Sequence, residues 1–232
     1  MTEIEQEPPP GFSLIEHAKT VVRKEASELE GPDDDIPPMF LWLGAHGYGI
    51  MPIADLMKGD EEKDKLTVVM TAALVVGRAT EAIHISTAWM AQVDTSTLSP
   101  EELERMKQGY ANPRPADRPD RIEAVVLTHI TTDTDSLVDA RVTRHKDKPP
   151  ELGEWETRSY ETGSLGGRFG DAIHLGLSMV KELPPELIDI IKEGWEVDRQ
   201  AELMNRFIKM AAQLMRVQME GGTPKVARIK EL

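Results

Sequence analysis

Residues Lys65–Val93, KLTVVMTAALVVGRATEAIHISTAWMAQV, form the longest apolar segment of this 232-residue chain and decide its fold. Up to Gly77, apolar residues recur at the three- and four-residue spacing of a helix with one buried side. At Ala82 the period changes to two, which is typical of a strand whose successive side chains point to opposite faces. We therefore predict a buried helix, capped by Asp60, that leads into the central strand of a sheet.

The predicted strand has one mainly apolar face and one face with polar groups: Ile83, Ile85, Thr87 and Trp89 on the first, and His84, Ser86, Ala88 and Met90 on the second. Such β-branched and aromatic residues favour a strand that is covered on at least one side. Lys65, Arg78 and Glu81 interrupt the apolar segment, and charges of this kind are costly within lipid. The segment is therefore predicted to belong to a core and not to span a membrane.

The composition restricts the classes of function. The formal net charge is −14 and the pI is near 4.9, whereas general binding to nucleic-acid phosphates needs clustered Lys and Arg. The chain has no cysteine, which excludes disulfides and thiolate metal sites and is typical of a reducing compartment. Neither a basic nor an apolar segment follows Met1, so we expect no signal peptide and a cytoplasmic protein.

One domain with an appendage is the organisation expected for this length. Residues 1–12 are acidic and rich in proline, and we expect a flexible arm. Residues 13–183 are predicted to form an α+β domain, whose first helix opens with the capping-box sequence Ser13–Glu16. We expect a mostly antiparallel sheet of five to six strands, covered on one face by the central helix and a long C-terminal helix.

An excursion over residues 94–120 interrupts this domain. The sequence Ser99–Glu102 is typical of a capping box with proline at the first helical position, and predicts a short helix. Three prolines in residues 112–120 then predict an extended segment outside the sheet. The excursion is either a lid over a functional site or a tolerated insertion.

Residues 184–220 are predicted to form a long C-terminal helix. Their apolar residues keep a regular three-four spacing over several heptads. At 1.5 Å per residue such a helix would be about 50 Å long, which exceeds the width of a small domain. Its apolar side therefore packs on the sheet, on a partner subunit, or on both, and self-association is a partner hypothesis. Residues 221–232 form a tail.

The segments Arg121–Thr132 and Leu137–His145 are predicted to form a hairpin that turns at Asp133–Asp135. A three-residue loop places His129 opposite Asp139, with opposite charges on one face and apolar pairs on the other. It also places Glu123 opposite His145.

Three loops contain groups that could bind ions. Asp33–Asp35 is a solvated acidic turn or, alternatively, a site for a divalent cation. The glycines of Gly44–Gly49, with His46 among them, favour a hairpin turn over an anion cradle. The glycine-rich run Gly163–Gly170 contains Arg168 and precedes a predicted helix, so it is either a linker or a weak phosphate site.

The best catalytic hypothesis places polar residues on one face of the sheet. His129, oriented by Asp139, would act as a base. The candidate ligand-binding residues are His84, Glu123, Arg141, His145 and Arg168. The alternative is a solvated sheet face with stabilising charge pairs. No established catalytic or metal-binding motif occurs, so we assign no metal site and no cofactor.

The runs AIHISTAWM and, after an interval, PDRIEAVVL carry a resemblance to known sequences. Over roughly residues 36–145 the chain resembles a group of uncharacterised bacterial and phage proteins, with Trp89 and residues 119–123 as the main points of likeness. The resemblance implies no activity, and it suggests an association with phage.

These observations favour a non-enzymatic protein that binds another protein or itself. The reasons are the acidic composition, the long apolar C-terminal helix and the missing catalytic motifs. The alternative is an enzyme or small-ligand-binding protein that uses the polar face of the sheet beneath the 94–120 excursion. A nucleic-acid role ranks third, and it would depend on Arg114, Arg118 and Arg121.

Overall fold

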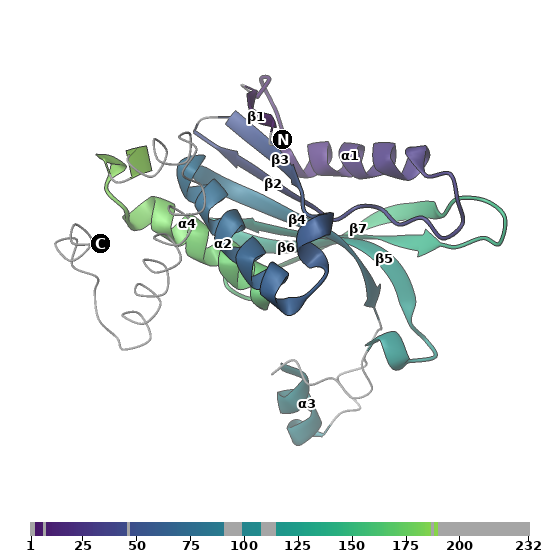
Figure 1. Cartoon of the computed structure of the whole chain (residues 1–232). Helices are drawn as coiled ribbons and strands as arrows, with labels where there is room; N and C mark the ends of the chain where they lie inside the picture. Colours follow the sequence, from purple (N-terminus) through teal and green to yellow (C-terminus); the bar gives the residue numbers. More distant parts are fainter. Residues whose placement is uncertain are drawn as a thin grey trace.

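A seven-stranded antiparallel sheet with helices on both faces organises the structure, a computed structural model that describes residues 3–6, 8–45, 47–90, 99–107, 115–186 and 188–189 (Figure 1). The strand order is β1-β3-β2-β4-β5-β6-β7. The strands are β1 (Glu3–Gln6), β2 (Met39–Gly44), β3 (Gly47–Pro52), β4 (Ala79–Met90), β5 (Ile122–Thr131), β6 (Thr134–Thr143) and β7 (Glu151–Glu161). The helices are α1 (Leu14–Glu28), α2 (Asp60–Val76), α3 (Pro100–Lys107) and α4 (Arg168–Glu182), with 3-10 turns η1 (Ala54–Met57) and η3 (Pro115–Asp117). The predicted α+β class is confirmed.

The structure describes most of the N-terminal arm and little of the predicted C-terminal helix. Residues 3–6, in the arm that we expected to be flexible, form β1 and pair with β3, and the sheet has seven strands where five or six were expected. The predicted helix 184–220 lies outside the described residues except for residues 184–186 and 188–189. Its length and its packing therefore stay predictions, and the tail 221–232 is not described.

The predicted change from helix to central strand is confirmed. Helix α2 ends at Val76 and β4 begins at Ala79, three residues before the expected position. Arg78 in the connection has a φ of 47°, and its guanidinium bonds Asp189 at 2.8 Å. The hairpin β2–β3 packs so closely against this connection that a Cβ on Gly44 would lie 2.1 Å from the Gly77 carbonyl oxygen. Only glycine fits at position 44 without a shift of the backbone.

Local helix signals are confirmed in part. The Ser13 hydroxyl accepts the Glu16 N–H at 3.5 Å at the start of α1. At α3 the Ser99 hydroxyl accepts the Glu102 N–H at 3.2 Å and the Glu102 carboxylate accepts the Ser99 N–H at 2.9 Å, which is a complete capping box. The expectation for α2 was wrong, because Gly59 occupies the cap position and Asp60 is the first helical residue.

Both faces of the sheet are covered, contrary to the expectation of one helix-covered face and one solvated face. Helix α1 packs through Leu14, Ala18 and Val22 on one face, which we call the α1 face. Helices α2 and α4 lie side by side on the other, the α2/α4 face (Figure 1). The inward residues on the α1 face include Met39, Leu41, Ile83, Ile85, Val125, Leu127, Val138 and Val142. Those on the α2/α4 face include Phe40, Trp42, Ala82 and Ile130.

The hairpin β5–β6 exists, but its predicted register was wrong. The strands are joined by two residues, Thr132 and Asp133, and the Thr131 hydroxyl accepts the Thr134 N–H at 2.8 Å. His129 consequently lies opposite Ser136, and Asp139 lies opposite Val126. The shift of three residues is odd, so it moves the side chains of β6 to the opposite face relative to those of β5.

Candidate functional site: a pocket around Arg144

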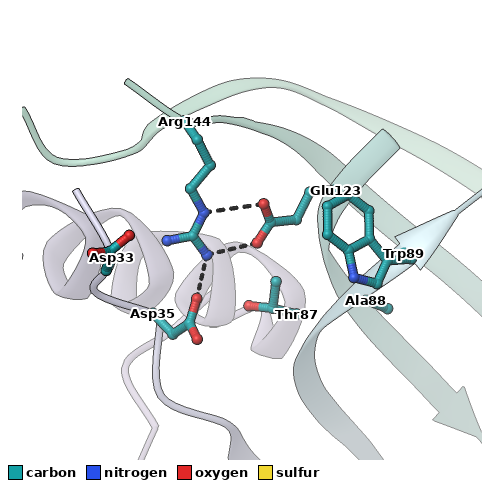
Figure 2. Close-up of a pocket in the computed structure, with 7 residues that line it drawn as sticks. All are labelled: Asp33, Asp35, Thr87, Ala88, Trp89, Glu123 and Arg144. Carbon is teal, nitrogen blue, oxygen red and sulfur yellow. Dashed lines mark hydrogen bonds and ion pairs between the residues drawn. The ribbon is translucent and has the colours of Figure 1, made fainter. Parts of the chain in front are cut away.

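A pocket of about 450 Å³ lies where the loop after α1 meets the ends of three strands (Figure 2). Its lining residues are Asp33, Asp35, Thr87, Ala88, Trp89, Glu123 and Arg144. Thr87 and Trp89 alternate along β4 and so share a face, while Glu123 on β5 is the register partner of Trp89. Arg144 directly follows β6. The register of the sheet therefore brings residues from four distant segments to one place.

Arg144 ties the acidic loop to the sheet. Its Nε and one terminal nitrogen donate to the two oxygens of Glu123 at 3.0 and 2.6 Å, and the same terminal nitrogen also donates to Asp35. The other terminal nitrogen donates to the carbonyl oxygens of Asp34 at 2.8 Å and Pro32 at 3.3 Å. The hydrogen bonds to Glu123 and then to Asp35 raise the pKa of Arg144 above its usual range. All three guanidinium nitrogens of Arg144 therefore donate within the protein, and Arg144 holds the acidic loop against the sheet.

The pocket keeps an excess of negative charge. Three carboxylates, those of Asp33, Asp35 and Glu123, line it together with the single guanidinium of Arg144, which leaves two uncompensated negative charges in the lining. Asp33 forms no hydrogen bond or ion pair with the residues that the structure describes, and it is exposed. Asp33 is therefore available to a ligand from solvent.

The aromatic wall of the pocket is Trp89. Its side chain is unusually accessible for tryptophan, at 44% exposure. The guanidinium of Arg121 lies over its ring, with Cζ 4.6 Å from the ring centroid, in a cation-π arrangement. The same ring therefore already holds one cation on its surface while it borders an acidic pocket.

The residues predicted as a catalytic pair do not meet. The Nε2 of His129 lies 2.7 Å from a carboxylate oxygen of Glu81, on the α1 face. Asp139 is on the α2/α4 face, where its carboxylate accepts a hydrogen bond from Arg158. The hypothesis that Asp139 orients His129 is wrong, because it depended on the incorrect register.

The predicted ligand-binding residues are dispersed, and only Glu123 lines the pocket. His84 is buried on the α2/α4 face against Phe169, with ring centroids 4.6 Å apart, and burial lowers its pKa to about 4. Arg168 bonds the carboxylate of Asp60 at 3.1 Å. His145 lies 3.4 Å from Glu151, and Arg141 is exposed on β6. These four residues do not form a common site.

Two features had no signal in the sequence. Arg144 follows a strand like any surface arginine, and only the β4–β5–β6 register shows that it joins Glu123 to the acidic loop.

Asp135, expected in the hairpin loop, is fully buried and accepts the Leu165 N–H at 2.9 Å. The Nε2 of His174 is 3.2 Å from the same carboxylate oxygen, without hydrogen-bond geometry. Asp135 therefore fixes the glycine-rich run before α4.

Within the described ranges, no three histidine, aspartate or glutamate side chains are grouped as metal ligands would be. None of the described helices combines the length and apolar character needed to cross a membrane.

Neither a protein-family model nor a curated protein nor a solved structure matches the chain.

Proposed function

We propose that this protein is a non-enzymatic binding module whose Arg144 pocket takes a cationic side chain of a protein partner. The observation that supports this proposal most directly is the exposed indole of Trp89 beside a lining with two excess negative charges. A lysine or arginine side chain can lay its apolar stem on an indole while its charged end bonds carboxylates. The acceptors available for that charged end are the carboxylate of Asp33 and the carboxylate oxygen of Asp35 that does not bond Arg144.

The other partner classes have less support. Arg118 bonds Asp120 at 2.8 and 2.7 Å and Arg121 lies on Trp89, so both arginines already have partners within the protein. Arg114, the third arginine of the nucleic-acid hypothesis, lies outside the described residues. The separation of His129 from Asp139 removes the geometric basis for the proposed base. We also propose that the protein acts in the cytoplasm, which its acidic and cysteine-free composition supports.

The test uses a blocked Gly-Lys-Gly peptide and the same peptide with norleucine in place of lysine. Norleucine keeps the apolar stem and lacks the charge. We expect the lysine peptide to shift the NMR resonance of the Trp89 indole N–H, and we expect the norleucine peptide to leave it unchanged. Asp33→Asn should weaken binding about threefold, in line with a solvent-exposed charge pair. Asp133→Asn, the same change in the exposed β5–β6 turn, should leave binding unchanged. Equal binding of both peptides would refute the proposal.

A small ligand is the second candidate for the same pocket. The volume of about 450 Å³ is in the range of small-molecule sites. A free diamine such as putrescine distinguishes the two functions in the same titration. Binding of the diamine that is much tighter than that of the peptide would favour a small-ligand-binding protein over a protein-binding module.

A further inference from the structure

Strand β7 is the longer of the two edge strands of the described sheet. Among the residues that the structure describes, it occupies the last place in the strand order and pairs only with β6, over residues Glu151–Glu161. The opposite edge is β1, which has only four residues. In an antiparallel edge strand, every second residue directs its N–H and C=O away from the neighbouring strand. Strand β7 therefore presents a longer row of outward backbone groups than β1 does.

From Trp155 onward β7 is a regular strand, and its bulge lies before that part. Val142 pairs with Leu152 and Ala140 with Trp155, so β7 has one extra residue between these pairs. From Trp155 to Glu161 the pairing is one to one. The sequence of β7 contains neither lysine nor proline, which are common protections of edge strands. Beyond its ladder with β6, the described backbone bonds include only one from this strand, in which the Glu161 carbonyl accepts the Ser164 N–H at 3.1 Å.

The side chains of β7 give this edge a negative charge. Glu151, Glu154, Glu156 and Glu161 are exposed, and Glu151 forms an ion pair with Lys148. The one basic residue of the strand, Arg158, bonds the buried Asp139, so it does not neutralise these glutamates. An acidic edge repels a second copy of itself and attracts a basic strand, because charges directly opposite each other across a strand pair interact.

We propose that β7 accepts an extended, basic segment of a partner protein as an added strand. The Trp155–Glu161 backbone would supply the hydrogen bonds. The exposed Glu154, Glu156 and Glu161 would select lysine or arginine side chains. This surface is formed by residues other than those of the Arg144 pocket, so the failure of either proposal leaves the other intact.

The experiment titrates the full chain with a short fluorescein-labelled oligolysine peptide, and binding is followed by anisotropy. Oligolysine carries charge on both faces of an added strand, as required because Glu156 and Glu161 lie on opposite faces of β7. The matched negative probe has glutamate in place of lysine. We expect the lysine peptide to bind and the glutamate peptide not to bind. The triple variant Glu154→Gln/Glu156→Gln/Glu161→Gln should weaken binding about tenfold, since three cross-strand charge pairs are lost.

The matched control is Glu28→Gln/Glu61→Gln/Glu101→Gln, which removes the same charge from exposed positions on α1, α2 and α3. It should retain binding. Backbone pairing is read independently by amide hydrogen exchange, in which alternate residues of Trp155–Glu161 should become protected when the peptide binds. Equal weakening by the two triple variants, or binding without that alternating protection, would overturn the proposal and leave a non-specific attraction to an acidic protein.

Discussion

The burial of His84 predicts a specific dependence of stability on pH. Its side chain is only 6% exposed, packs on Phe169, and has no hydrogen-bond partner for Nε2 among the described residues. Burial disfavours the charged imidazolium and lowers the pKa from 6.5 to about 4. Protons therefore bind the unfolded state more readily. The contribution of the neutral His84 to the free energy of unfolding is fully present above pH 6.5 and is lost as the pH falls toward 4.

The size of this effect follows from the two pKa values. Between pH 7 and pH 5, the unfolded-state imidazole becomes protonated while the folded-state imidazole stays mostly neutral. The free energy of unfolding should fall by about 2 kcal/mol through this residue. Most carboxylates remain ionised in this interval, so it isolates the histidines.

The assay is urea unfolding at pH 7 and pH 5, followed by tryptophan fluorescence, for the wild type and His84→Leu. Burial also lowers the pKa of His17, so the relevant quantity is the difference between the two proteins. We expect the variant to lose about 2 kcal/mol of the pH-dependent change. NMR titration of the imidazole in the wild type gives the folded-state pKa directly. A variant with the full wild-type pH dependence, or an imidazole that titrates near pH 6.5, would refute the reasoning.

Three further predictions concern other parts of the chain. Arg144→Ala should lower the free energy of unfolding by about 2 kcal/mol in urea titrations, because the half-buried Glu123 loses its partner and the acidic loop its anchor. Gly44→Ala should cost about 3 kcal/mol or more in the same assay, since its Cβ would meet the Gly77 carbonyl. The full chain should form a dimer by light scattering and become monomeric after truncation at Asp189; a strictly monomeric full chain would contradict self-association through residues 184–220.

Local signals in the sequence predicted the parts of the fold that depend on neighbouring residues. The period change after α2 located the central strand, because helix and strand place side chains at different intervals. Ser99 and Glu102 predicted the start of α3, because both partners of the capping box lie within one turn. These predictions needed no information about distant segments.

Contacts between distant segments could not be predicted in the same way. The β5–β6 register depends on whether the turn has two or three residues, and the Thr131 hydroxyl stabilises the shorter turn.

Single residues of the candidate site were predictable from the sequence, but their arrangement was not. Asp33–Asp35, Trp89 and Glu123 each drew attention in the sequence, but their convergence follows from the pairing of Trp89 with Glu123 and from the clamp by Arg144. Sequence patterns contain no information on which loop reaches which strand end.

The left-handed conformation of Arg78 has a consequence for how this position can evolve. Glycine would adopt a φ of 47° without the steric penalty that an arginine pays there. It would also abolish the bond to Asp189, which links the start of the central strand to the segment beyond α4. Replacement of Arg78 by glycine would therefore relieve the local strain and lose the long-range bond at the same time.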